Sequence, residues 1–247
     1  MELEIIAHRG FSAAAPENTL AAFAAAIEHG ADAIELDVQL TADGIPVVIH
    51  DSKLKRTTGT KGKVFKKTLS DLKQLDAGAW FHPQFSGQQI PTLAEALHSA
   101  SGIPKHIYLD VKTNGDWPDI AIANLLDTIL TRHTEAKCVI ASFNHQFVEQ
   151  VRQQDSGQKV TIGYLVATRS AYKSQLPRAA AAGNAVMLSE YRVLLKYPTL
   201  VEASRHHGYD LVSCSVDKPK HFQRLLAIGV NRIITNTLLK QLPCPPD

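Results

Sequence analysis

Short apolar runs alternate with amphipathic stretches from one end of the chain to the other. This pattern is typical of a parallel sheet whose strands are joined by helices. We expect strands at Leu3–Ala7, Ala33–Val38, Ile107–Val111, Cys138–Ala141, Thr161–Leu165, Ala185–Leu188, Leu211–Ser213 and Arg232–Ile234. We expect helices at Thr19–His29, Thr92–Ser99, Pro118–His133, His145–Gln154, Ser170–Ala182, Tyr197–His207 and Pro219–Ile228. Strands and helices in this order predict a closed (β/α)₈ TIM barrel.

One further apolar run, Pro46–Ile49, does not fit this alternation. About seven residues separate it from the strand that ends near Val38, whereas a parallel crossover needs roughly a dozen. The intervening Asp43-Gly44 favours a tight hairpin, so we expect this run to fold back antiparallel on an extension of the second strand. A turn centred on Asp43-Gly44 would pair Asp37 with His50, and so bring His50 to the carboxylates of that strand.

Between Ser52 and about Gln89 the apolar periodicity weakens, and Gly, Lys and Thr accumulate. A connector of this length in a compact domain is often a lid or a binding element. We therefore expect residues 1–247 to form one barrel domain that carries a small inserted subdomain at about 52–89. Residues Pro243–Asp247 are interpreted as a frayed tail.

The composition indicates a globular protein of a reducing compartment. Apolar residues make up 45% of the 247 positions and charged residues 20%, and the net charge of +2 gives no indication of a nucleic-acid partner. Cys138, Cys214 and Cys244 are odd in number and lack metal-ligand spacing, which argues against a disulfide framework. The acidic start Met1–Glu4 is unlike a signal peptide, and no run of about 18 apolar residues occurs. We predict a cytoplasmic protein without membrane insertion.

Three carboxylates fall at the ends of predicted strands. Glu35 and Asp37 are two residues apart and so face one side of their strand, and Asp110 and Lys112 repeat this spacing on the next one. Carboxylates that point into a barrel need a positive partner, because burying an unpaired charge costs free energy. Oxygen ligands without paired cysteines favour a hard cation such as Mg²⁺ or Ca²⁺. The alternatives are an edge strand with a wet acidic face and, for Asp110 and Lys112, a surface pair of little energetic value.

Two histidines accompany these acids. His8-Arg9-Gly10 follows the first strand, where barrel active sites lie, although a strand-ending histidine with a solvated arginine would look the same. His50-Asp51 ends the hairpin strand, and two imidazoles at one site can serve as acid and base near neutral pH. The basic stretch is interpreted as a solvated face, although its place beside the proposed site would also let it attract an anionic substrate: Lys53, Lys55, Arg56, Lys61, Lys63, Lys66 and Lys67. Five further histidines are interpreted as surface residues: His82, His98, His133, His206 and His207.

The order of these motifs resembles that of the glycerophosphodiester phosphodiesterases, relatives of the phosphatidylinositol-specific phospholipase C barrels. The motifs that carry the resemblance are His8-Arg9-Gly10, Pro16-Glu17-Asn18-Thr19, Glu35-Leu36-Asp37-Val38, Asp43-Gly44, Val47-Val48-Ile49-His50-Asp51, Asp76-Ala77-Gly78 and Ile90-Pro91-Thr92-Leu93. They cover the N-terminal half of the chain. In the C-terminal half, Ser142-Phe143 is similar to the fifth-strand region of the family, and Ser213–Asp217 takes the place of a Trp-Thr-Val-Asn motif.

The resemblance implies metal-dependent hydrolysis of small-molecule glycerophosphodiesters, such as glycerophosphocholine or glycerophosphoethanolamine, to glycerol 3-phosphate and an alcohol. It implies that His8 and His50 form the acid–base pair and that Arg9 and Lys112 bind substrate. One divalent cation, Mg²⁺ or Ca²⁺, is then expected on Glu35, Asp37 and Asp110.

Three positions depart from the family pattern: Asp110 in place of Glu, Cys214 in place of Trp, and Asn236 where Asp is common. Loss of an aromatic wall at Cys214 keeps open a lysophospholipase D-like or cyclising activity on lysolipids. A non-catalytic barrel that binds phosphodiesters is the alternative from another class, because a fold does not guarantee a reaction.

Overall fold

Eight parallel strands close into a barrel in a computed structural model that describes residues 2–131, 137–206 and 210–238. The strands are β1 (Glu4–His8), β2 (Ala33–Leu40), β4 (His106–Val111), β5 (Lys137–Ser142), β6 (Thr161–Val166), β7 (Ala185–Glu190), β8 (Asp210–Cys214) and β9 (Arg232–Thr235). They follow one another around the ring in this order, and β9 pairs with β1 to close it. The TIM barrel predicted from the alternation is confirmed.

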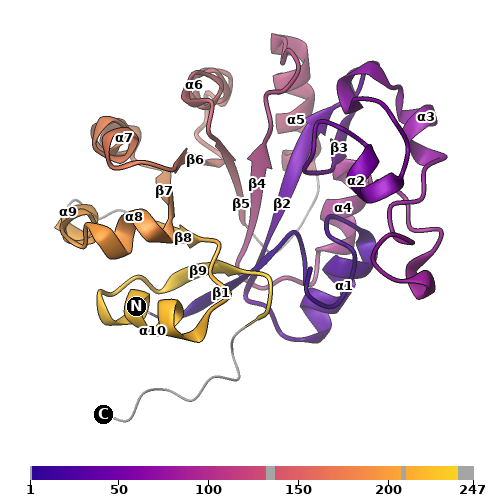
Figure 1. The fold of residues 1–247 in the computed structure, drawn as a ribbon. Coiled ribbons are helices and arrows are strands. Elements are labelled where there is room, and N and C mark those ends of the chain that lie inside the picture. The colour runs from indigo at the N-terminus through magenta and orange to yellow at the C-terminus, as the bar shows by residue number, and fades with distance from the viewer. Residues whose placement is uncertain (1, 132–136, 207–209, 239–247) are drawn as a thin grey trace.

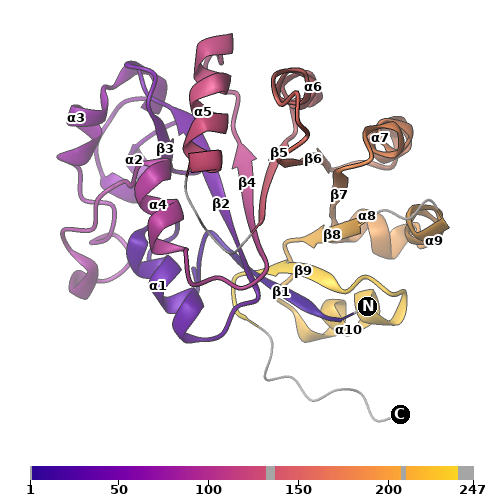
Figure 2. The same ribbon diagram turned by 180° about the vertical axis from the view of Figure 1, so that it is seen from behind.

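The connecting helices surround the ring of strands (Figures 1 and 2). They are α1 (Leu20–Glu28), α4 (Leu93–Ser99), α5 (Asp119–Thr131), α6 (His145–Gln154), α7 (Arg169–Ala182), α8 (Tyr191–Lys196), α9 (Thr199–His206) and α10 (Pro219–Ala227). All seven predicted helices are present, whereas α8 was missed because it is too short to show a period and follows β7 directly. The predictions for His133, His207, Cys244 and Pro243–Asp247 concern residues outside the described part of the chain. Within the described part of the chain, none of the helices is long and apolar enough to cross a bilayer.

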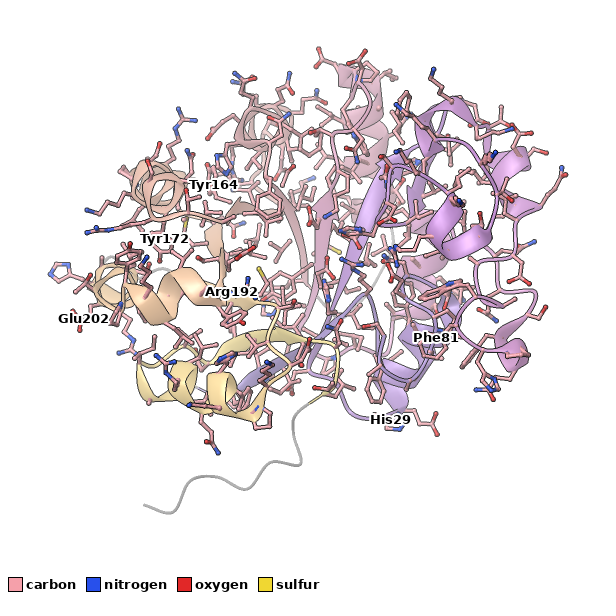
Figure 3. The ribbon with its side chains drawn as sticks, in the orientation of Figure 1. His29, Phe81, Tyr164, Tyr172, Arg192 and Glu202 are labelled. Atoms are coloured by element: carbon pink, nitrogen blue, oxygen red, sulfur yellow. The ribbon has the colours of Figure 1, made fainter. Side chains whose placement is uncertain are left out.

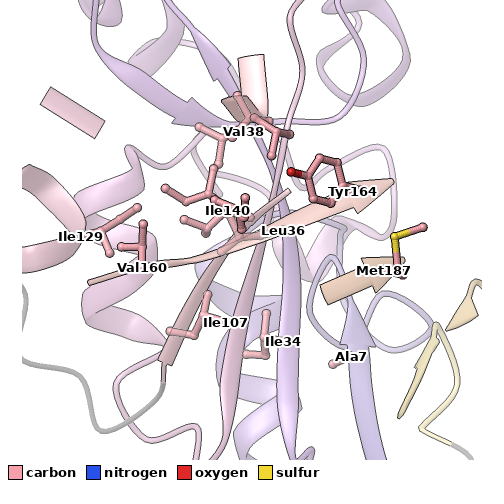
Figure 4. Packing of buried hydrophobic residues seen from close by; sticks show 14 of the residues in the cluster. Ala7, Ile34, Leu36, Val38, Ile107, Ile129, Ile140, Val160, Tyr164 and Met187 are labelled. Carbon is pink, nitrogen blue, oxygen red and sulfur yellow. The ribbon is translucent and has the colours of Figure 1, made fainter. Parts of the chain in front are cut away.

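Alternate residues of each strand face either the barrel interior or the helices. In β2, Ile34, Leu36 and Val38 belong to the large apolar cluster between strands and helices, part of which is shown in Figure 4. Ala33 belongs instead to a second cluster that fills the barrel, with Tyr108 of β4. Because of the same alternation, the polar residues at the C-terminal ends of β2 and β4 point towards the barrel axis.

The short strand β3 (Pro46–Val48) runs antiparallel to β2, as the Asp43-Gly44 signal suggested. The predicted register is wrong by one residue, because Val38 pairs with Val48 and the Ile49 amide donates to the Asp37 carbonyl at 2.9 Å. The turn is centred on Asp43 alone, and Gly44 adopts the left-handed conformation with φ of 77°. A three-residue loop of this kind shifts the pairing relative to a two-residue turn. Asp37 therefore lies opposite Ile49 and not opposite His50.

The inserted segment between β3 and α4 forms short helices with a small apolar cluster of their own. The helices are α2 (Lys55–Thr58), η1 (Val64–Lys66), α3 (Leu69–Lys73) and η2 (Pro83–Phe85), and the cluster contains Leu54, Val64 and Leu72. Figures 1 and 2 both show α2 and α3 beside β3 on one side of the barrel. Residues from this segment can therefore reach the loops at the upper end of β2.

A buried charge network ties the strands together at the opposite end of the barrel. The Glu4 carboxylate is 3% exposed and lies 3.0 Å from His106 Nδ1, 3.1 Å from the Tyr108 hydroxyl and 3.2 Å from Arg232 Nε. Burial raises the pKa of Glu4, but His106 and Arg232 outweigh it and hold the pKa below its usual value. The network joins β1, β4 and β9, so its role is structural.

We expect Glu4→Gln to reduce the free energy of unfolding by about 3 kcal/mol at pH 7, because it removes the buried charge that pairs with His106 and Arg232. Urea unfolding measures this loss, with Glu28→Gln on the exposed face of α1 as the control. Since the folded pKa of Glu4 is lowered, its contribution is complete above the usual carboxyl pKa of about 4.3 and is lost as pH falls through the folded value. Equal effects of the two substitutions, or a loss that persists unchanged at low pH, would contradict this assignment.

Candidate active site

A cavity of about 480 Å³ opens at the C-terminal ends of the strands. All of the residues predicted to act line it, namely His8, Arg9, Glu35, Asp37, His50, Asp110 and Lys112. In (β/α)₈ enzymes this end of the barrel carries the active site, since the βα loops converge there. The structure thus gathers into one cavity groups that are dispersed along the sequence.

The strand register places the polar groups side by side. His8 at the end of β1 pairs with Glu35 of β2, and Asp37 pairs with Asp110 of β4. Because β1, β2 and β4 are neighbours, side chains of equal height on their inner faces must lie close together. This proximity follows from strand order and alternation alone.

The three carboxylates of Glu35, Asp37 and Asp110 could hold a metal ion. One oxygen from each lies within 4.8 Å of the other two, and the residues are 5%, 1% and 9% exposed. Burial, and then the charges of Asp37 and Asp110, raise the pKa of Glu35, while burial also raises that of Asp110. Asp110 Oδ1 is buried without a hydrogen-bond partner. An all-oxygen set with one free, buried ligand atom fits a hard divalent cation, and the alternative of a wet acidic edge strand is wrong.

Two cationic side chains border this acidic cluster. Lys112 Nζ lies 2.9 Å from Asp37 Oδ1 and 2.5 Å from Asp110 Oδ2, and Arg9 Nε lies 3.2 Å from Asp37 Oδ2. Burial opposes ionisation of Asp37, but Lys112 and Arg9 outweigh it and lower its pKa. The Asp110–Lys112 contact is therefore part of the cavity and not a surface pair.

The loop after β1 is held in an unusual backbone conformation. Arg9 and Asn18 both have a φ of 58°, a left-handed conformation that costs free energy for residues other than glycine. The Arg9 amide donates to Glu35 Oε2 at 3.1 Å, and the Asn18 amide group donates to Asp37 Oδ2 at 2.8 Å. At Gly10 a β-carbon would lie 2.6 Å from the Ala22 backbone carbon, so only glycine allows this loop to approach α1. The loop conformation thus orients two of the three carboxylates.

His8 is oriented by hydrogen bonds that run through Asn236 to Asp217. Its Nδ1 lies 2.7 Å from Asn236 Oδ1, while Asn236 Nδ2 donates to Asp217 Oδ2 at 2.7 Å. Because the Asp217 carboxylate only accepts hydrogen bonds, it fixes which end of the amide faces His8. His8 then carries its proton on Nδ1, and the lone pair of Nε2 faces Glu35 at 3.8 Å. Burial and the Arg9 charge lower the pKa of His8.

His50 is oriented in the same way by a carboxylate. Its Nδ1 lies 2.8 Å from Asp51 Oδ1, which leaves Nε2 available to the cavity. Gln39, which is 2% exposed, directs its side-chain amide to the carbonyls of Ile49, His50 and Asp51, each at 2.9 Å. The buried glutamine fixes the backbone that carries His50 after β3 has ended, so His50 reaches the cavity despite the register shift.

Glu190, Tyr191 and Arg192, on the wall opposite β2, were not predicted from the sequence. Glu190 ends β7, which lies across the barrel from β2, and Tyr191 and Arg192 of α8 follow it directly. These residues line the cavity with Phe143, Cys214, Lys218 and His221. Figure 3 shows Arg192 on α8, on the side of the molecule away from Phe81 of the inserted segment. A cue existed in the sequence, since each of these residues follows a predicted strand at the same end of the barrel.

Cys214 ends β8 and also lines the cavity. Burial, followed by the charges of Asp110, Glu35 and Glu190, raises the pKa of its thiol to about 12. The side chain is therefore a neutral thiol near pH 7 and acts as a small apolar surface. It widens the cavity compared with an aromatic side chain at this position.

Three carboxylates, two histidines and two cationic side chains meet at the mouth of a (β/α)₈ barrel. This arrangement is typical of a class of hydrolytic barrel enzymes. Residues 8–240 match the model of the glycerophosphoryl diester phosphodiesterase family. The glycerophosphodiester phosphodiesterase of Caldanaerobacter subterraneus is 35% identical over 241 residues, which cover 96% of this chain and 95% of that protein. The glycerophosphodiester phosphodiesterase of Bacillus subtilis is 34% identical, with 94% and 82% covered.

Solved structures agree with these relatives. A phosphodiesterase from Oleispira antarctica, in complex with its product sn-glycerol-3-phosphate, superposes with a TM-score of 0.86 and 28% identity, covering 95% of this chain and 93% of that one. This chain belongs to the glycerophosphodiester phosphodiesterase family, and its activity is the hydrolysis of glycerophosphodiesters. Family membership favours an enzyme over the non-catalytic binding barrel.

Proposed function

We propose that the cavity hydrolyses glycerophosphodiesters with one divalent cation, Mg²⁺ or Ca²⁺, and with His8 and His50 as the acid–base pair. The observation that carries the proposal is the convergence of three buried carboxylates and two histidines in one cavity. The fit of the carboxylates to a cation supports metal dependence. When bound, the cation supplies positive charge that neutralises the phosphate oxygens and polarises the phosphorus centre.

Arg9 and Lys112, the cationic side chains beside the acidic cluster, are the groups that we assign to the non-bridging phosphate oxygens. Both line the cavity and both contact Asp37, so their charged ends are held beside the acidic cluster. Charge on these oxygens changes during attack at phosphorus, and fixed cations in a partly desolvated site stabilise the transition state without reorganisation. Arg9 directly follows β1 and Lys112 directly follows β4, so the two side chains would hold the phosphate between them.

Proton transfer falls to the two imidazoles. With Nδ1 of His8 and of His50 each directed at an acceptor, both Nε2 atoms can exchange a proton with substrate or water. One histidine would take the proton of the attacking oxygen, and the other, in its protonated form, would give one to the oxygen of the departing alcohol. The water or hydroxyl bond to phosphorus forms as the bond to the alcohol breaks, which yields glycerol 3-phosphate directly when water attacks.

The opposite wall would receive the alcohol. Glu190 and the rings of Phe143 and Tyr191 line it, and a carboxylate beside aromatic faces suits an alcohol that carries an ammonium group. Choline and ethanolamine esters of glycerol 3-phosphate are the substrates that we propose on this basis. The product bound in the Oleispira antarctica structure, sn-glycerol-3-phosphate, supports glycerol 3-phosphate as the second product of the reaction.

The test is an assay across several glycerophosphodiesters in the presence and absence of metal, with the phosphorus-containing products identified by ³¹P NMR. We expect the choline and ethanolamine esters to give glycerol 3-phosphate, and the esters of neutral alcohols to be hydrolysed more slowly. A cyclic phosphate product would show that a neighbouring hydroxyl attacks in place of water. Faster turnover of substrates with an intact acyl chain would replace this proposal with a lysophospholipase D-like activity.

A further inference from the structure

Arg56 of the inserted segment joins two carboxylates that come from different loops. Its Nε and Nη2 donate to Asp51 at 2.7 and 3.0 Å, and its Nη1 and Nη2 donate to Glu17 at 2.7 and 2.8 Å. Each carboxylate thus receives two parallel hydrogen bonds from one guanidinium group. Such forked pairs are the most directional that an arginine makes. Arg56 was interpreted from the sequence as part of a solvated basic stretch; its side chain is 41% exposed, and it also holds both carboxylates.

Each of the two carboxylates also holds a residue of the proposed catalytic site. Asp51 Oδ1, which accepts from Arg56, is the oxygen that lies 2.8 Å from His50 Nδ1. Glu17 Oε1 accepts from Arg56 and from Arg9 Nη1, the latter at 2.8 Å. One guanidinium group is therefore a single carboxylate away from both His50 and Arg9.

The ion pairs themselves contribute little to folding. The Arg56 side chain is 41% exposed, and ion pairs at exposed positions add little to stability because solvent screens them. Glu17 is better protected, with 12% of its side chain exposed, and the Trp80 ring centroid lies 5.9 Å from the Arg56 guanidinium carbon. The value of this arrangement is geometric, because without Arg56 the Asp51 and Glu17 carboxylates can rotate away from their partners.

We propose that Arg56 is a positioning residue that couples the inserted segment to the active site, orienting His50 through Asp51 and Arg9 through Glu17. The proposal rests on the roles proposed above for His50 and Arg9. It gives the inserted segment a task that its own apolar cluster does not explain. Arg56 acts through its two carboxylates and does not contact substrate.

The test compares Arg56→Ala with Lys55→Ala, which removes a positive charge from the neighbouring exposed position of α2. We expect Arg56→Ala to lower kcat by about 10- to 100-fold, the usual effect of losing a group that orients a catalytic residue. Lys55→Ala should retain wild-type kcat and KM. Added guanidinium chloride, far below denaturing concentrations, should restore part of the lost kcat in Arg56→Ala and should not activate the wild type.

Arg56→Lys provides the second variant, and it serves also if Arg56→Ala does not fold. It keeps the charge, but an ammonium group cannot form two forked pairs, so kcat should remain reduced. A rise in KM with unchanged kcat in Arg56→Ala would overturn the proposal, because it would assign Arg56 to attraction of the anionic substrate. Full recovery in Arg56→Lys would overturn it as well.

His50→Ala, measured in parallel, separates failure of this inference from failure of the proposed function. If His50→Ala loses turnover while Arg56→Ala retains wild-type kcat, the positioning role is wrong and the catalytic role of His50 stands. If His50→Ala retains turnover, the proposed function fails, and the positioning role built on it is overturned with it.

Discussion

Removal of divalent cations with EDTA should abolish glycerophosphodiester hydrolysis, and readdition of Mg²⁺ or Ca²⁺ should restore it. Glu35, Asp37 and Asp110 place three carboxylates around one point, and Lys112 and Arg9 lie against Asp37. A bound cation is worth several kcal/mol in the transition state of phosphoryl transfer, and each 1.36 kcal/mol corresponds to tenfold in rate, so a loss of at least about 100-fold follows. Residual activity is measured after exhaustive chelation and dialysis.

Thermal unfolding gives a readout of the same site that does not depend on turnover. A cation that binds only the folded protein at about 100 times its Kd stabilises it by about 2.7 kcal/mol, so Tm should rise with added metal. Asp110→Asn should lose most of this rise, whereas Asp71→Asn, on an exposed carboxylate of α3, should retain it. Because burial raises the pKa values of Glu35 and Asp110, protons compete with the cation and its affinity should fall as pH is lowered.

Full activity in the presence of EDTA would contradict the metal role. An equal rise of Tm in wild type and Asp110→Asn would place the cation elsewhere. Asp110→Glu is a further test of the ligand, since it lengthens the side chain by one methylene group. If the shorter carboxylate limits metal affinity, this variant should bind the cation more tightly.

The barrel and its acidic cluster could be predicted because both depend on simple periodicities. Two-residue spacing in Glu35-Leu36-Asp37 places both acids on one face, and the inner position of Ala33 confirms which face that is. Parallel strand order then brings Asp110 beside Asp37 without any detail of the loops. Local alternation and strand order are properties that a sequence carries directly.

The parts that could not be predicted depend on single residues in loops. The hairpin register shifted by one because Gly44 closes a three-residue turn, a choice that Asp43-Gly44 does not decide by itself. Arg56 lay in a run of basic residues, and nothing in the run distinguishes it from Lys53 or Lys55. Its partners Glu17 and Asp51 come from separate loops, so only the folded chain identifies it.

Replacement of either proposed catalytic histidine should have a comparably large effect on turnover. His8→Ala and His50→Ala each remove a proton-transfer group, and we expect each to lower kcat by about 100-fold or more. His98→Ala, at an exposed position of α4, is the control and should retain wild-type turnover. The rise of Tm with added metal should persist in both histidine variants, which separates a chemical defect from loss of the site.

The two histidines differ in their partners, and this difference can be used to assign their roles. His8 Nδ1 faces the neutral amide of Asn236, whereas His50 Nδ1 faces the charged Asp51 carboxylate. A glycerophosphate ester of 4-nitrophenol has a leaving group that departs without protonation, so loss of the general acid should cost much less with this substrate than with glycerophosphocholine. The histidine whose replacement is tolerated only with the nitrophenyl ester is the acid, and the other is the base. Equal losses with both substrates in both variants would show that neither imidazole protonates the leaving alcohol. The departing choline oxygen would then receive its proton from another group in the cavity.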